Sequence, residues 1–343
     1  MSRSLPSNRP PRILVTRTDR IGDLVLSTPV FSALRRKFPD AWIAVLTFAE
    51  NREIVGKNPD LDEVILYDKK GDQKNWPGQV LFALRLKRKK FDLVIHLHAT
   101  NRMHFVSWMA GIPVRIGWNR RMPWALTHVL PYVKKEGKKH EAEYNFDLLA
   151  PLDIAYSSEF KMFFPVTQRN QISVEELLKQ RDIKKSHPLV VLSPGASDPS
   201  KVWCARGFAE VAEKIAAKYD VALLMIGTRQ DRPYLDAVKK YCSVEIHDLS
   251  AQLSIGMLGA LLGEAALLIC NDSGPVHIAQ ALGRPVVSVF VRQQAGINPD
   301  RWRPLCKNSQ IVLTAGTDDA ASAGKVFEAV ESFAAVLKET VIL

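Results

Sequence analysis

Residues 266–290, ALLICNDSGPVHIAQALGRPVVSVF, decide the fold class. The apolar run 266–272 predicts a buried strand, Pro275 marks the first turn of a helix over 275–282, and the apolar run 285–290 predicts a second strand. Continuous apolar strands joined by a helix are typical of a parallel sheet that is covered on both faces. The stretch therefore predicts an α/β fold, with polar side chains at the point where the first strand meets the helix.

The same alternation extends through the chain and divides it into two halves. Further strands are expected over 13–17, 42–47, 63–67, 92–97, 188–195 and 221–227, and further helices over 22–37, 76–90, 205–219 and 230–241. We predict two Rossmann-like domains with parallel sheets, over 13–170 and 188–320, that face each other across a ligand cleft. The charged segment 171–187 is predicted to be a linker, and the polar, proline-rich residues 1–12 a disordered arm.

Positive charge is concentrated in the first half of the 343 residues. Residues 1–165 hold 27 Lys and Arg against 17 Asp and Glu, so they carry +10 of the net charge of +11. Such an excess can attract phosphates or an acidic membrane surface. The run 85–90 alone is equally typical of a cationic helix end. One helix end does not account for the charge difference between the two halves of the chain. The basic clusters show no interleaved stripe of exposed aromatic residues, which disfavours a nucleic-acid-binding protein.

Cysteine spacing and hydropathy exclude several other classes. The four cysteines are widely separated and form no C-x-x-C pair, which argues against a zinc site and against a disulfide framework. The apolar stretch 255–270 is interrupted by glycines and by Glu264 and is too short to span a bilayer. The first twelve residues lack the apolar core of a signal peptide. We therefore expect a soluble, cytoplasmic protein.

Asp23 ends the string TDRIGD (18–23), which follows a predicted strand and precedes an apolar helix. Active-site carboxylates are often found at this edge of a sheet, whereas an Asp before a helix also serves as a simple cap. Its position alone favours neither interpretation.

A second candidate site follows the strand that begins at 188. Ser193, Gly195, Ser197 and Lys201 stand on a glycine turn before a helix, where backbone N–H groups and one ammonium can hold phosphate oxygens. The string is not a Walker loop, because it lacks G-K-[ST]. The alternative interpretation is an ordinary surface turn.

A third candidate site is the string NDSGPVH (271–277). Asp272, Ser273 and Gly274 place a hydroxyl and free N–H groups at a helix N-terminus, which favours binding of a diphosphate without a metal ion. His277 lies one turn further and is either a ligand contact or a packed structural histidine.

Together these strings resemble the ADP-heptose:lipopolysaccharide heptosyltransferases, glycosyltransferase family nine, which have the GT-B architecture. The resemblance runs from about Arg12 to Val336 and is carried by R-x-D-R-I-G-D-L-V-L-S-T-P, V-R-I-G-W (114–118), S-P-G-A-S with K-x-W (193–203), and N-D-S-G-P-x-H-I-A-x-A-L-G-R-P (271–285). It implies that the N-terminal domain binds the acceptor and the C-terminal domain the sugar nucleotide. It also implies that a C-terminal helix within 321–343 returns to the first domain.

The resemblance implies roles for individual residues. Asp23 matches the general base, and Lys201 matches a lysine at the donor phosphates. The candidate donor-binding residues are Ser193, Gly195, Ser197, Lys201, Asp231, Asp272, Ser273, Gly274 and His277. The candidate acceptor-binding residues are Arg20, His98, Arg120 and Arg121.

Two positions depart from the family pattern. His96 and His98 occur on the strand where relatives commonly carry an acidic residue, which bears on the identity of the acceptor. Asp231 stands in for the acidic residue that relatives place against the donor sugar.

These features predict an inverting glycosyltransferase that moves heptose from ADP-heptose to the inner core of lipopolysaccharide, onto Kdo-lipid A or a core heptose. Asp23 would take the proton of the acceptor hydroxyl, while Lys201 and the helix start at 272–274 would offset the charge of the departing diphosphate. Neither a cofactor nor a metal ion is then expected.

The expected partners are the nucleotide-sugar donor, the anionic acceptor and the anionic face of the inner membrane as a peripheral contact, without nucleic acid. The sequence leaves the oligomeric state open. Two alternatives remain: a glycosyltransferase for another nucleotide sugar, and a non-catalytic protein that binds anions or nucleic acid. The strand-to-helix turns lack G-x-G-x-x-G, which disfavours an oxidoreductase.

Overall fold

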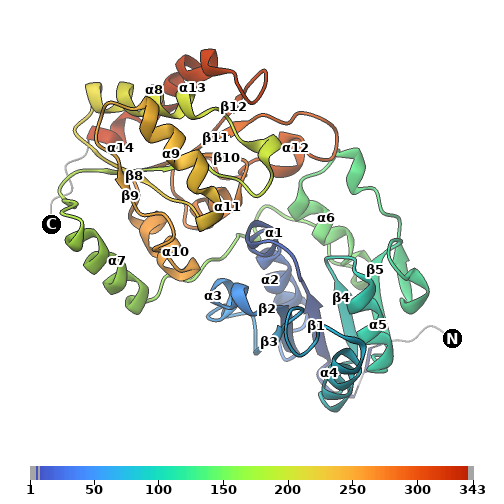
Figure 1. The fold of residues 1–343 in the computed structure, drawn as a ribbon. Coiled ribbons are helices and arrows are strands. Elements are labelled where there is room, and N and C mark those ends of the chain that lie inside the picture. The colour runs from blue at the N-terminus through green and yellow to red at the C-terminus, as the bar shows by residue number, and fades with distance from the viewer. Residues whose placement is uncertain (1–4, 7, 339–343) are drawn as a thin grey trace. The chain divides into compact units, whose positions relative to one another are not determined.

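Two compact units make up the computed structural model, which describes residues 5–6 and 8–338 (Figure 1). The division falls between Pro165 and Val166, and each unit is built around one six-stranded parallel sheet. The predicted α/β fold with two Rossmann-like parallel sheets is thereby confirmed.

The sheet of the N-terminal unit has the strand order β3-β2-β1-β4-β5-β6. Its strands are β1 (Arg12–Thr16), β2 (Trp42–Phe48), β3 (Glu63–Tyr67), β4 (Leu93–His96), β5 (Val114–Trp118) and β6 (His128–Leu130). The chain adds strands on one side of β1 and then returns to place β4 on the other side. In such an order the crevice at the carboxyl ends of β1 and β4 is the expected ligand site.

Helices cover both faces of this sheet. They are α1 (Ile21–Val25), α2 (Thr28–Lys37), α3 (Arg52–Val55), α4 (Trp76–Arg88), α5 (Asn101–Met109) and α6 (Glu141–Asp147). The expected helix over 22–37 is divided into α1 and α2, because Pro29 in the first turn of α2 has no N–H to continue the bonding of α1. α4 and α5 pack against each other (Figure 1). Phe82 and Leu86 of α4 and Met103 of α5 belong to the buried hydrophobic core of this unit.

The C-terminal unit repeats the same topology with the strand order β12-β11-β10-β7-β8-β9. Its strands are β7 (Leu189–Ser193), β8 (Ala222–Met225), β9 (His247–Asp248), β10 (Leu267–Asn271), β11 (Val286–Phe290) and β12 (Ser309–Leu313). Its helices are α7 (Gln168–Gln180), α8 (Ala205–Lys218), α9 (Arg232–Tyr241), α10 (Ile255–Glu264), α11 (Gly274–Ala281), α12 (Pro299–Trp302), α13 (Ala323–Glu331) and α14 (Ala334–Lys338). The strand order reverses between β7 and β10, so the expected ligand site lies at the carboxyl ends of these two strands.

Most of the predicted linker over 171–187 is helical, because its first ten residues belong to α7. Thr167 caps α7 through a hydrogen bond from the N–H of Asn170, and α7 packs against α10 of the same unit. Val174 and Leu178, four residues apart, form the buried stripe of this helix. The many charged residues of the segment lie around this narrow stripe, which is why composition alone indicated a linker.

The C-terminal helix predicted within 321–343 corresponds to α13 and α14. Val326 and Val330 of α13 and Leu337 of α14 lie in the hydrophobic core of the C-terminal unit. The apolar face of α13 is buried against α8, β11 and β12 of the same unit. Residues 339–343, the rest of that prediction, are outside the described part of the chain.

The predicted disordered arm is fixed to the fold at its end. The Arg9 guanidinium donates to both Asp92 oxygens, at 2.5 and 2.9 Å, and the Arg12 N–H donates to the same carboxylate. This charge-assisted pairing orders the residues that lead into β1. Residues 1–4 and 7 are outside the described part of the chain. Within the described residues, no helix is long and apolar enough to cross a membrane.

Candidate active site

The carboxyl ends of β1 and β4 lie side by side, with Thr16 in register with His96. The loops that follow bring Arg17 beside the carbonyl of Leu97, 3.4 Å from one guanidinium nitrogen. The candidate site of the N-terminal unit is therefore positioned by strand pairing.

Asp23 lies in the first turn of α1, where it does not act as the helix cap. Arg20 occupies the cap position, with an extended backbone and no capping hydrogen bond from its side chain. Asp23 Oδ1 instead lies 2.5 Å from Arg17 Nη2. The sequence left open whether Asp23 is an active-site carboxylate or a simple helix cap. The structure excludes the helix cap.

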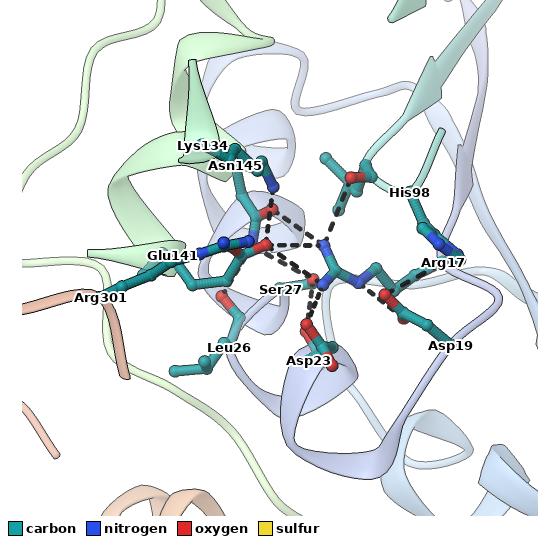
Figure 2. A network of polar contacts seen from close by, with 12 residues as sticks. Arg17, Asp19, Asp23, Leu26, Ser27, His98, Lys134, Glu141, Asn145 and Arg301 are labelled. Atoms are coloured by element: carbon teal, nitrogen blue, oxygen red, sulfur yellow. Dashed lines mark hydrogen bonds and ion pairs between the residues drawn. The ribbon is translucent and has the colours of Figure 1, made fainter. Parts of the chain in front are cut away.

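Arg17 is the centre of a buried ionic cluster (Figure 2). Its side chain is only 2% exposed. Its Nε lies 2.8 Å from Asp19 Oδ1, and its Nη2 lies 3.2 Å from Glu141 Oε1. Asn145 accepts a hydrogen bond from Nη1 at 3.0 Å. One guanidinium thus contacts three carboxylates from two distant segments of the chain, 19–23 and 141–147, which its planar set of N–H donors makes possible.

Lys134 adds a second positive charge to the cluster, in which Asp19, Asp23 and Glu141 supply the carboxylates, and its Nζ lies 2.6 Å from Glu141 Oε1. Burial raises the pKa of Asp19 to about 7; Arg17 opposes this rise, and the negative charges of Asp23 and Glu141 add to it. Asp19 therefore changes protonation near neutral pH, beside the candidate base.

His98 belongs to this site, whereas His96 does not. His98 donates from Nδ1 to the carbonyl of Thr18 at 3.0 Å and lies 3.8 Å from Asp19. Burial and then the charge of Arg17 lower the pKa of His98 to about 4, so its ring is neutral and Nε2 is an acceptor. His96 is wholly buried between Thr16 and Ser107, which makes it a structural residue.

The three predicted arginines occupy exposed positions in the N-terminal unit. Arg20 begins α1 beside the cluster. Arg120 and Arg121 follow β5, where Arg120 donates to the hydroxyl of Tyr132 at 2.6 Å. Arg20 lies three positions before Asp23 in the sequence. Among the described residues, no recorded contact joins Arg120 or Arg121 directly to the ionic cluster.

In the C-terminal unit, Asn271 joins the loops after β7 and β10. Its side-chain amide donates to the carbonyl of Pro194 at 2.7 Å, and its oxygen accepts from the N–H of Trp203 at 3.0 Å. Asn271 is wholly buried. It thus aligns the glycine turn with the start of α11.

Lys201, Asp272 and Arg292 form a charge cluster at this point. Lys201 Nζ lies 2.6 Å from Asp272 Oδ2, and Arg292 Nη2 lies 3.8 Å from the same oxygen. Arg292 also contacts Asp198 at 3.0 Å. Sequence reasoning missed Arg292, which follows β11 without any recognisable motif.

Two potential donor atoms of this region, Ser273 Oγ and Arg292 Nε, are buried without a recorded hydrogen-bond partner among the described residues. Ser273 is the cap residue of α11, yet its side chain makes no capping hydrogen bond. Unpaired buried donors beside a helix N-terminus are well suited to an oxyanion. His277 is buried one turn further along α11.

The sequence indicated Gly195 as part of a phosphate-binding turn. The structure gives a different reason for a glycine here, which is the lack of space for a Cβ. A Cβ at this position would lie 2.4 Å from Cγ of Asp231. Asp231 itself accepts from the N–H and the hydroxyl of Thr228, both at 2.7 Å. Gly195 therefore admits the side chain of Asp231 next to the turn, with Ser193 buried before it and Ser197 exposed after it.

The two units supply different chemical groups. The N-terminal cluster presents a fixed carboxylate, and the C-terminal cluster presents two cations with a helix N-terminus. Among the described residues, no group of three or more His, Cys, Asp or Glu side chains could hold a metal ion.

Known proteins are similar to this chain in sequence. The model of glycosyltransferase family 9 (heptosyltransferase) matches residues 81–329. The lipopolysaccharide heptosyltransferase 3 of Escherichia coli is 27% identical over 305 residues, which are 84% of each chain. The lipopolysaccharide heptosyltransferase 2 of E. coli K12 is 23% identical over 310 residues, 88% of this chain and 87% of the relative.

Solved structures share the fold. A family 9 glycosyltransferase from Veillonella parvula matches with a TM-score of 0.84 at 22% identity, over 96% of this chain and 99% of that chain. The E. coli ADP-heptose lipopolysaccharide heptosyltransferase II matches with a TM-score of 0.79 at 21% identity, over 94% and 98%. These matches confirm the predicted GT-B type of the fold.

Proposed function

Since the chain belongs to glycosyltransferase family 9 and is a glycosyltransferase, we propose that it transfers heptose from ADP-heptose to the inner core of lipopolysaccharide. The observation that carries the proposal is the cluster of Lys201, Arg292 and the start of α11 at the switch point of the C-terminal sheet. Relatives that are named as lipopolysaccharide heptosyltransferases support the choice of donor and acceptor.

The donor diphosphate binds at the C-terminal cluster in this proposal. Lys201 and Arg292 are both held near Asp272, so their charges are in place before a ligand arrives. The unpaired donors on Ser273 and Arg292 offer hydrogen bonds to phosphate oxygens. The Asp272 carboxylate keeps the two cations together and is itself an acceptor for sugar hydroxyl groups.

Asp23 acts as the general base on the acceptor hydroxyl. Arg17 contacts only Oδ1 of Asp23, which leaves Oδ2 for the incoming hydroxyl. A base in hydrogen-bond reach contributes roughly 10²–10⁴ to the rate of a proton-coupled displacement. Direct attack by the acceptor oxygen breaks the bond between the anomeric carbon and the diphosphate, with inversion at that carbon.

The leaving diphosphate gains negative charge as this bond breaks. Lys201, Arg292 and the N–H groups at the start of α11 offset the charge, a preorganised electrostatic role. We therefore propose that the reaction uses neither a metal ion nor another cofactor. The positive charge of the N-terminal unit supports an anionic acceptor there, and a cytoplasmic protein that contacts the inner membrane peripherally.

Nucleotide binding tests the proposal. Calorimetric titration with ADP, UDP, GDP and NAD, in the absence of divalent metal, is expected to show selective ADP binding that Lys201→Ala and Arg292→Ala each weaken by about tenfold or more. Lys214→Ala is the matched control, because Lys214 pairs only with the exposed Glu210 on α8. Preference for UDP or GDP would reassign the donor, and absence of any nucleotide binding would overturn the proposal.

A further inference from the structure

Four aromatic side chains form a continuous row on the surface of the N-terminal unit. Trp76 at the start of α4 contacts Phe105 of α5, with ring centroids 4.8 Å apart. Phe105 contacts Trp108 at 5.8 Å, and Trp108 contacts Trp124 at 5.5 Å. Trp124 lies in the short helix η2 (Pro123–Ala125). We call these four residues the aromatic row.

The three tryptophans of the aromatic row are exposed, and Phe105 between them is partly buried. Trp76 is 57% exposed, Trp108 45% and Trp124 60%. On α4, Leu81 and Leu84 are likewise exposed. Other side chains of α4 and α5 make up the buried core beneath them. Adjacent exposed apolar groups of this size mark an interaction surface.

Positive charge surrounds the same elements. Residues 73–135 contain 12 Lys and Arg and a single acidic residue, Asp92, so the whole net charge of +11 is accounted for by this segment. Arg85, Lys87 and Arg88 follow Leu84 on α4, and the recorded ion pairs of the described residues join none of the three to a carboxylate. These cations are available to an anionic partner.

The combination fits a lipid surface better than a nucleic acid. Tryptophan is enriched at the boundary between membrane and water, and Lys and Arg side chains near an anionic leaflet are attracted to it. Nucleic-acid bases need open ring faces for stacking. Here Trp108 and Trp124 meet edge to face at 78°, and the exposed leucines add aliphatic area that bases do not use.

We propose that the aromatic row, with Leu81, Leu84 and the cations of α4, docks the N-terminal unit on an anionic bilayer. The inference deepens the proposed function, because a lipopolysaccharide acceptor is anchored in a membrane by its acyl chains. It corrects the expectation that the basic clusters lack exposed aromatic neighbours. Packing of α4 against α5 brings together rings that are far apart in the sequence.

Vesicle binding of the full chain tests docking without donor or acceptor. Flotation with phosphatidylcholine vesicles, with and without phosphatidylglycerol, is expected to show binding only to the anionic vesicles. The variant Trp76→Ser/Trp108→Ser/Trp124→Ser and the variant Arg85→Gln/Lys87→Gln/Arg88→Gln should each lower the bound fraction by about tenfold or more. Tyr241→Ala and Lys214→Gln, exposed residues of the C-terminal unit, are the matched controls.

Further readouts separate docking from the rival occupants and from catalysis. Lipids brominated in their acyl chains should quench tryptophan fluorescence of the wild type and quench the triple Trp variant less. ADP binding, and transfer to a water-soluble core oligosaccharide, should be equal in wild type and both variants. Vesicle binding that is unchanged in the Trp variant would overturn the proposal. Tighter binding of single-stranded nucleic acid than of vesicles, or a dimer that the Trp changes dissociate, would also overturn it.

Discussion

Replacing Arg17 by Met tests whether one buried guanidinium holds the N-terminal site together. The change keeps much of the apolar length of the side chain and removes its charge. Asp19, Asp23 and Glu141 would then lose the buried guanidinium that all three contact. Removing one partner of a buried ion pair costs about 3–5 kcal/mol. We expect a loss of that size in the free energy of unfolding at neutral pH.

Urea denaturation followed by circular dichroism measures this loss, with Arg85→Met on the exposed face of α4 as the control. The loss should shrink as the pH falls, because protonation of the carboxylates removes the uncompensated negative charge. Arg17→Lys should recover only part of the stability, since an ammonium cannot bond to three carboxylates in the geometry of a guanidinium. A loss below about 1 kcal/mol in Arg17→Met, at any pH above 7, would refute the reasoning.

Three further predictions follow from single features. Gly195→Ala should destabilise the C-terminal unit by about 1–3 kcal/mol, because its Cβ would overlap Asp231; scanning calorimetry should show no such change in Gly316→Ala, where a Cβ meets open space. Asp19 has a pKa raised to about 7 in the folded state against 3.8 in the unfolded state, so it lowers stability as the pH rises through this window. The stability of Asp19→Asn relative to wild type should therefore increase from about pH 4 to about pH 8, and a flat difference in urea titrations would contradict the assignment. Asp23→Asn should lower the transfer rate by roughly 10²-fold or more while ADP affinity in calorimetry is kept, and full turnover would rule out Asp23 as the base.

The strands were predictable because burial on both faces of a parallel sheet leaves a continuous apolar run. The motif around Asp272 was predictable for a related reason: a strand, a polar turn and a helix start follow one another within a few residues. Lys201 was found because it stands next to such a turn. Local patterns of this kind carry both the fold and much of the donor site.

The other features of the molecule were not predictable from the sequence, because they depend on contacts between distant parts of the chain. Glu141 is 124 residues away from Arg17, and nothing near either residue indicates the pair. Arg292 lies in a loop of ordinary composition and is recognisable only through its contacts with Asp198 and Asp272. The aromatic row arises where α4, α5 and η2 pack together, so no periodicity in the sequence reveals it.

The most direct test of the central claim is the transfer reaction itself. Purified protein is incubated with ADP-heptose and a lipopolysaccharide inner-core acceptor that lacks its next heptose, and the products are analysed by mass spectrometry together with release of ADP. The account predicts an acceptor that gains one heptosyl unit, with one ADP released for each transfer and no gain from UDP- or GDP-sugars. An unmodified acceptor in the presence of bound ADP-heptose, or equal transfer from a UDP-sugar, would contradict it.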